Sequence, residues 1–166
     1  MDIAPGDTFP DLTLPDHAGR LRSLGDLAAG DPLLLQTYRG FWCPKEQAFF
    51  RRLVDLQDDV EVAYTSMASL SVDPSEVAAA FRAGLGARWT FLSDAGREHL
   101  DALGLRETTD TLHHPYQPAV FVLGPDLAVH AAYNGYWFWG RPTMDELRAD
   151  LRAVTRVVRD DWEVPR

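Results

Sequence analysis

Cys43, the only cysteine of the chain, is the residue best placed for chemistry. It lies in the segment Tyr38-Arg39-Gly40-Phe41-Trp42-Cys43-Pro44-Lys45-Glu46, where a predicted strand end and a tight turn deliver it to the first turn of a helix. Unpaired backbone N–H groups and the positive end of the helix dipole favour an anion at that position. We therefore expect a stabilised thiolate at Cys43, with Arg39 close enough to assist, and nucleophilic or redox chemistry.

A lone cysteine also has an ordinary alternative, because most free cysteines act as small buried hydrophobes. The strand-to-helix position, the neighbouring Arg39 and the following Pro44 favour the reactive interpretation of Cys43. With no second cysteine in the chain, an internal disulfide is impossible. Any redox cycle therefore needs a thiol from another molecule.

The first half of the chain predicts strands and helices that alternate around this segment. A turn-rich stretch between residues 12–14 and 21–24 predicts a short hairpin, and the apolar run 33–38 predicts a buried strand. From Cys43 to Val60, apolar residues recur at helical spacing. Next we expect a strand at 62–67, a helix capped by Asp73 that runs to about 83, a strand at 89–92 and a short helix at 97–103.

The second half predicts a hairpin and a closing helix. Residues 119–123 and 127–133 form the two arms of the hairpin, separated by a Gly-Pro-Asp turn. Thr143 and Glu146 form a capping signature for the last helix, whose apolar stripe includes Leu147 and Leu151. Strands alternating with helices indicate an α/β fold with a mixed central sheet flanked by helices.

Length and charge limit the possible classes of protein. A chain of 166 residues is about one domain long, so we expect a single domain over residues 1–166. The formal charge of −9 argues against nucleic acids or anionic membranes as partners. The N-terminus lacks a signal-peptide pattern and no window has the length and apolarity of a membrane span. We therefore expect a cytoplasmic protein.

The segment Tyr38–Pro44 resembles the Tyr-Arg-Gly-x-Trp-Cys-Pro stretch of the peroxiredoxin-like branch of the alkyl hydroperoxide reductase and thiol-specific antioxidant superfamily. The resemblance extends to residues 6–12, 91–94 and 118–122, and so spans most of the chain. It implies a thioredoxin-like fold with an N-terminal β-hairpin extension. A homodimer is also a family expectation.

The resemblance implies a one-cysteine thiol peroxidase without a cofactor. Cys43 would attack a hydroperoxide to give a sulfenic acid, which is reversible. An external thiol, either a low-molecular-weight thiol or a thioredoxin, would then restore the cysteine. We assign catalytic roles to Cys43 and Arg39, and substrate contacts to Gly40, Phe41, Trp42 and Pro118. Thioredoxin folds place a cis-proline at the position of Pro118, so the Gln117–Pro118 bond is predicted to be cis.

Three positions depart from the pattern of typical peroxiredoxins, and a fourth departs from many members of this branch. Gly40 stands where a threonine or serine is usual, Gln36 where a proline is usual, and Pro118 takes the position of a later arginine. Glu46 replaces the second cysteine of many members, and we interpret it as a solvated helix-surface residue. These departures keep two alternatives open. One is a thioredoxin-fold protein recruited to a biosynthetic step or to partner binding, with Cys43 weakly reactive or inert. The other is a disulfide reductase that uses a partner thiol.

Two further segments carry possible sites. His113 and His114, near Asp110, lack a metal-binding spacing, so we expect a polar loop without a metal. Residues 108–117 lead into Pro118 and are predicted to border the Cys43 pocket. The aromatic run 133–140 indicates a dimer contact, an apolar substrate wall, or core packing under the last helix.

Overall fold

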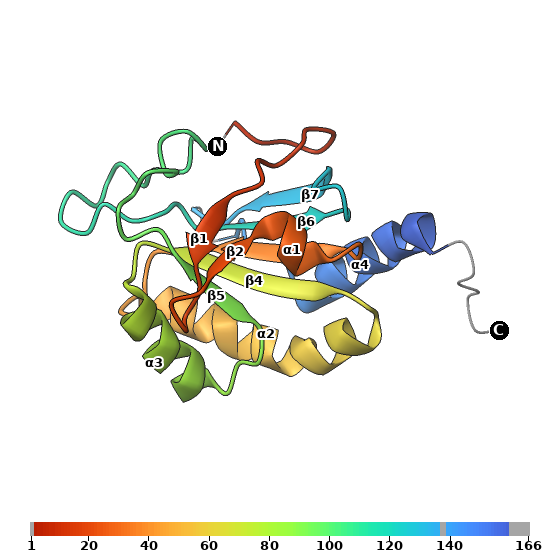
Figure 1. The fold of residues 1–166 in the computed structure, drawn as a ribbon, viewed down its shortest axis with the longest axis horizontal. Coiled ribbons are helices and arrows are strands. Elements are labelled where there is room, and N and C mark those ends of the chain that lie inside the picture. Colours follow the sequence, from red (N-terminus) through yellow and green to blue (C-terminus); the bar gives the residue numbers. More distant parts are fainter. Residues whose placement is uncertain (1, 137–138, 160–166) are drawn as a thin grey trace.

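The computed structural model describes residues 2–136 and 139–159 and is built on a five-stranded mixed sheet (Figure 1). The strand order is β5-β4-β3-β6-β7. Strand β3 pairs in parallel with β4, as β4 does with β5, whereas the pairs β3–β6 and β6–β7 are antiparallel. The strands are β3 (Leu33–Thr37), β4 (Ser66–Ser71), β5 (Thr90–Ser93), β6 (Ala119–Leu123) and β7 (Val129–Asn134).

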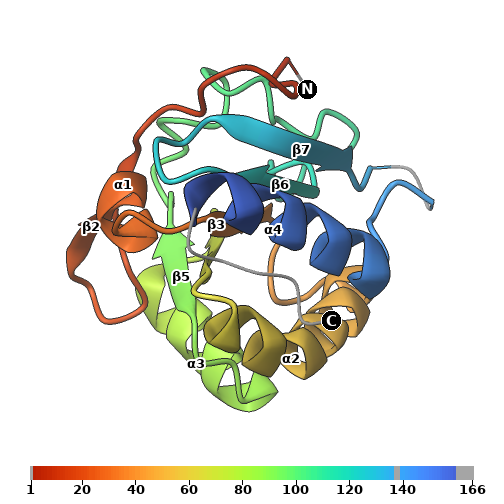
Figure 2. The same cartoon turned by 90° about the vertical axis from the view of Figure 1, so that its right-hand side faces the viewer.

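Helices and a small hairpin cover the two faces of the sheet. One face packs against α2 (Pro44–Val62), α3 (Ser75–Leu85) and α4 (Met144–Val158), which lie together in Figure 2. The other face packs against the antiparallel hairpin of β1 (Thr13–Pro15) and β2 (Leu21–Ser23), and against α1 (Leu24–Ala28). The predicted α/β architecture with an N-terminal hairpin is confirmed, whereas the short helix α1 was not predicted.

Strand β3 is buried on both faces and leads directly to the cysteine. Leu33 and Leu35 join the apolar cluster on the hairpin side, whereas Leu34 joins the cluster beneath α2 and α4. Such a central strand reads as an unbroken apolar run because both of its faces need apolar side chains. The predicted strand is confirmed, and its C-terminal end determines where the following turn begins.

Two predicted boundaries and one predicted helix are wrong. Helix α2 continues through Val62, so the next strand begins only at Ser66, after Tyr64 adopts a left-handed φ of 52°. Residues 97–103 form successive turns instead of a helix, beginning with Arg97 at a φ of 59°. Asp73 does not cap α3, whose N-cap is Pro74. Two of the three differences coincide with a non-glycine residue at positive φ, which the apolar spacing does not predict.

The capping signature of α4 is confirmed. The Thr143 hydroxyl accepts the Glu146 N–H at 3.2 Å, and the Glu146 carboxylate accepts the Thr143 N–H at 2.7 Å. Leu147, Leu151 and Val154 are buried against the sheet, as the apolar stripe predicted. Across residues 2–136 and 139–159, no helix has both the length and the apolar character needed to cross a membrane.

Candidate active site

Cys43 is the N-cap residue of α2, at φ −80° and ψ 116°. Pro44 begins the helix, and the Cys43 N–H donates to the Gly40 carbonyl at 3.2 Å, which closes the turn between β3 and α2. The cysteine is only 2% exposed. The predicted placement at the start of a helix is therefore confirmed, and the sulfur lies below the molecular surface.

Gly40 allows the turn to form. Its φ of +148° belongs to the range that glycine adopts without a Cβ penalty. A Cβ at this position would lie 2.5 Å from Nε1 of Trp42 and 3.2 Å from Oδ1 of Asp73. The indole of Trp42 therefore occupies the space that a side chain at position 40 would need.

Asp73 holds the same turn from the end of β4. Its carboxylate accepts the Phe41 N–H at 2.9 Å, and the side chain is buried. Burial raises the pKa of Asp73, and the hydrogen bonds from Phe41 and the Ser71 hydroxyl act in the opposite direction. The local sequence pattern predicted Asp73 to be a helix cap. Its contact with Phe41 joins segments 32 residues apart, so no local pattern predicts it.

Four side chains form what we call the Trp42 cluster: Arg39, Trp42, Asp110 and His113. The Arg39 guanidinium lies 5.1 Å from the centroid of the Trp42 ring, and His113 stacks on that ring at 4.1 Å. Asp110 accepts a hydrogen bond from Arg39 at 2.8 Å and lies 3.0 Å from Nδ1 of His113. Residues 110 and 113 of the 108–117 segment therefore contact the turn that immediately precedes Cys43, whereas a pocket at Cys43 stays a prediction.

The Trp42 cluster contains one strongly perturbed acid and one unused donor. The backbone N–H of His113 lowers the pKa of Asp110 to about 2, so this carboxylate stays charged at neutral pH. Nε of Arg39 is buried and has no hydrogen-bond partner within the described residues. The guanidinium of Arg39 is thus fixed beside the turn and keeps one donor available.

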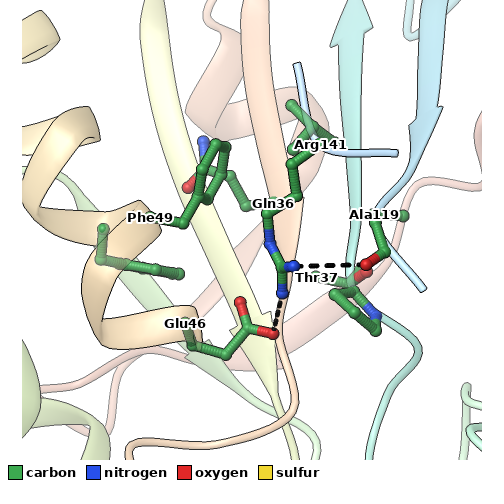
Figure 3. A pocket seen from close by; sticks show the side chains of 10 residues that line it. Gln36, Thr37, Glu46, Phe49, Ala119 and Arg141 are labelled. Atoms are coloured by element: carbon green, nitrogen blue, oxygen red, sulfur yellow. Dashed lines mark hydrogen bonds and ion pairs between the residues drawn. The ribbon is translucent and has the colours of Figure 1, made fainter. Parts of the chain in front are cut away.

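Glu46 lies in a narrow crevice beside the start of α2 (Figure 3). It is 1% exposed, and its carboxylate accepts a hydrogen bond from Arg141 at 2.6 Å. Arg141 also donates to the Gly135 carbonyl at 3.3 Å. Burial raises the pKa of Glu46, whereas the Arg141 cation opposes that shift. The interpretation of Glu46 as a solvated residue is wrong, because it lies on the same helix face as Phe49.

Pro118 lines this crevice, but its peptide bond is trans, so the predicted cis bond is wrong. The Thr37 hydroxyl donates to the Gln117 carbonyl at 2.7 Å, and the Gly135 N–H donates to the Pro118 carbonyl at 2.7 Å. These bonds hold the segment in the trans form, which is also the intrinsic preference of an X-Pro bond. The crevice is too narrow to admit a water molecule.

The predicted site residues fall into two groups. Arg39, Gly40 and Trp42 pack together in the turn that precedes Cys43, and Phe41 exposes its ring at the same turn. Pro118 belongs to the crevice that contains Glu46. Since Glu46 lies one helical turn beyond Cys43, the first turn of α2 joins the two groups.

Arg141 was not among the site residues predicted from the sequence. It lies between β7 and α4, where no local pattern connects it with Glu46, 95 residues earlier.

Of the aromatic run 133–140, positions 137 and 138 lie outside the described residues. Tyr133 donates to Asp150 of α4 at 2.6 Å, as core packing under the last helix predicts, whereas Trp139 is 89% exposed. In the described ranges, no three His, Cys, Asp or Glu side chains are grouped to hold a metal ion.

Residues 5–132 match the sequence profile of the AhpC/TSA family. The chain belongs to the AhpC/TSA family. A relative of this AhpC/TSA protein is the provisionally named peroxiredoxin Rv2521 of Mycobacterium tuberculosis, 34% identical over 105 residues. The match covers 61% of this chain and 64% of the relative, so the chain spans less than two thirds of the length of that relative.

Solved structures confirm the thioredoxin-like fold of this AhpC/TSA protein. Peroxidoxin BcpB of Mycobacterium tuberculosis superposes with a TM-score of 0.78 at 24% identity, covering 95% of this chain and 99% of that chain. Reduced Prx3 of Vibrio vulnificus, solved in complex with hydrogen peroxide, gives a TM-score of 0.78 at 22% identity, covering 89% and 96% of the two chains. These two structures confirm the predicted fold, and the family match over residues 5–132 confirms the predicted family resemblance.

Substitution of Gly40 tests the packing of the turn. Gly40→Ala is expected to lower the free energy of unfolding by about 2 kcal/mol, because the new Cβ is strained and displaces Trp42. Urea unfolding would measure the change. Gly84→Ala is the matched control, since Gly84 is helical with nothing near its Cβ position, and it should stabilise by about 0.5 kcal/mol. Equal effects of the two substitutions would contradict the packing argument.

Substitution of Glu46 tests the buried ion pair. Glu46→Gln should destabilise the protein by about 3 kcal/mol, because it leaves the Arg141 cation without its partner charge. The double variant Glu46→Gln, Arg141→Met should recover part of that loss in urea unfolding. Asp145→Asn breaks an exposed pair with Arg148 and should cost less than about 0.5 kcal/mol. If the double variant loses as much unfolding free energy as Glu46→Gln and Arg141→Met lose together as single variants, the two side chains do not stabilise each other.

The depressed pKa of Asp110 predicts a pH-dependent contribution to stability. The folded-state value of about 2 lies below the ordinary value of 3.8, so the stabilisation is present above pH 3.8 and is lost as the pH falls toward 2. Asp110→Asn should therefore be less stable than the wild type at neutral pH, with the difference shrinking across that window. Thermal unfolding over a pH series measures it, and a difference independent of pH would contradict the assignment.

Proposed function

We propose that the protein is a one-cysteine thiol peroxidase that reduces hydrogen peroxide or organic hydroperoxides. The observation that carries this proposal is the single cysteine of an AhpC/TSA family member at the N-terminus of α2. Unpaired N–H groups and the helix dipole at this position favour the thiolate, which is the nucleophilic form. The peroxiredoxin relative and the peroxide complex of Vibrio vulnificus Prx3 support the same chemistry.

In the oxidative half-reaction, the Cys43 thiolate attacks the terminal oxygen of the hydroperoxide. A sulfur–oxygen bond forms while the oxygen–oxygen bond breaks, and the departing oxygen takes up a proton and leaves as water or an alcohol. Cys43 becomes a sulfenic acid. The peroxide is reduced by two electrons and the sulfur is oxidised by two, so the step balances without a cofactor.

In the reductive half-reaction, an external thiol attacks the sulfenic sulfur, releases water and forms a mixed disulfide with Cys43. A second thiol then attacks this disulfide and restores the Cys43 thiol. Both thiols come from outside because the chain has no second cysteine. A low-molecular-weight thiol and a thioredoxin both fit this requirement.

Arg39 is the proposed second catalytic residue. Its Nε is a buried donor without a protein partner in the described chain, and it belongs to the cluster beside the Cys43 turn. In this proposal the donor stabilises the thiolate or the oxygen that departs from the hydroperoxide when the oxygen–oxygen bond breaks. Gly40, Phe41 and Trp42 are the proposed substrate contacts on the turn. Pro118, immediately before β6, is the proposed contact from the second half of the chain.

Glu46 and Arg141 are proposed as positioning residues. Their ion pair ties the first turn of α2 to the loop that follows β7. Because buried pairs demand good geometry, this contact restricts where the N-terminus of α2 and hence Cys43 can lie. Homodimerisation and a cytoplasmic location belong to the same proposal and follow from the family resemblance and the sequence.

The peroxidase proposal predicts fast oxidation of Cys43. Stopped-flow measurements should show that the wild type reacts with hydrogen peroxide or an organic hydroperoxide about 100-fold faster than free cysteine, as an activated thiolate allows. Mass spectrometry should detect a trapped sulfenic acid. Cys43→Ser is the control and should consume no peroxide. A wild-type rate no faster than free cysteine would instead support recruitment of the fold to another role.

A further inference from the structure

We propose that Asp110 is a specificity-determining residue: by holding the 106–117 segment against Trp42, it limits the size of the molecules that reach Cys43. The inference rests on the proposed peroxidase function, because it concerns which hydroperoxides and thiols react at the same sulfur. It follows from three observations: the position of the segment, the different hydrogen-bond donors to the two oxygens of Asp110, and the burial of Cys43.

The 106–117 segment is a long loop closed at its base. Arg106 forms a bridge with Tyr116, the Glu107 N–H donates to Pro115 at 3.0 Å, and the Gln117 N–H donates to Leu105 at 2.6 Å. In Figure 1 this part of the chain, green to cyan, extends as a loop away from the sheet. The base is therefore fixed to the fold, whereas the tip depends on its own contacts.

The tip, residues 110–113, reaches the rest of the protein through few groups. Asp110 pairs with Arg39 and His113 stacks on Trp42, while Arg97 donates to the His113 carbonyl at 3.0 Å. Leu112, between them, is 81% exposed. Since Trp42 immediately precedes Cys43, the contacts of the tip determine how the turn before the sulfur is covered.

The two oxygens of Asp110 have separate tasks. Oδ1 accepts the backbone N–H groups of Leu112 and His113, at 3.1 and 3.0 Å, and so shapes the tip. Oδ2 accepts the hydrogen bond from Arg39 and so attaches the tip to the turn. Oδ2 also lies 3.0 Å from Nδ1 of His113, so the attachment involves both Arg39 and the His113 ring, whereas the backbone N–H groups of the tip depend on Oδ1.

Access to the sulfur requires the protein to open around Cys43. Cys43 is 2% exposed, and the crevice at Glu46 is too narrow for a water molecule. A small oxidant needs only a small opening of the turn, whereas a bulky hydroperoxide or a protein thiol needs a larger one. With Asp110 attached to Arg39, the larger opening breaks an ion pair and a ring stack, so large reagents are selectively slowed.

Asp110→Asn tests this directly. Asparagine keeps an oxygen for the backbone N–H groups of the tip but places an amide N–H₂ where Oδ2 faced Arg39. The rates to compare are Cys43 alkylation by iodoacetamide and by a bulky aromatic maleimide, and oxidation by hydrogen peroxide and by cumene hydroperoxide. We expect the bulky reagents to react about tenfold faster with the variant, and the small reagents to change less than about threefold.

Two further variants complete the experiment. His113→Ala removes the stack on Trp42 and should give the same selective gain. Asp101→Asn breaks the exposed pair between Asp101 and Arg106 near the base of the loop, and should change no rate. Equal acceleration of small and bulky reagents, or no acceleration, would overturn the proposal. Because alkylation needs no peroxidase activity, a wild type that fails with peroxides but shows this size dependence would refute only the proposed function.

Discussion

The structure depends on one constraint: a helix begins directly after a strand that is buried on both faces. Strand β3 pairs with β4 on one edge and with β6 on the other, and Leu34 and Leu35 are fully buried, so its C-terminal end is fixed by the core. Helix α2 is fixed in turn by Phe50 and by the Glu46–Arg141 pair. The short turn between them has little freedom, and Cys43 is held at the N-terminus of α2.

Three carboxylates surround this turn, and each is compensated differently. Asp73 is buried and accepts a backbone N–H from Phe41, Asp110 pairs with Arg39 at the partly exposed side, and Glu46 pairs with Arg141 inside the crevice. A buried carboxylate without a partner would destabilise the fold. Each of these three carboxylates has a local donor or cation, so the turn can hold all of them.

Packing explains one departure from typical peroxiredoxins, Gly40. Gly40 lacks the side chain that a threonine or serine would provide, and the indole of Trp42 fills that space. Trp42 is held in turn by Arg39 and His113. A larger residue at position 40 would displace this arrangement. The missing hydroxyl and the aromatic cover are therefore two consequences of one local packing solution.

The sequence by itself determined the elements whose signals are local. The apolar run of β3, the helical spacing of α2 and the Thr143–Glu146 box depend on neighbours within a few residues, and so does the delivery of Cys43 to a helix start. Spacing also contained an unused signal, since Glu46 precedes Phe49 and Leu53 on one buried helix face. Only the tertiary structure decided the partners, because Arg141, Asp73 and Asp110 reach the site from segments 32 to 95 residues away. Contacts at such separations depend on how the sheet orders its strands, which no local pattern encodes.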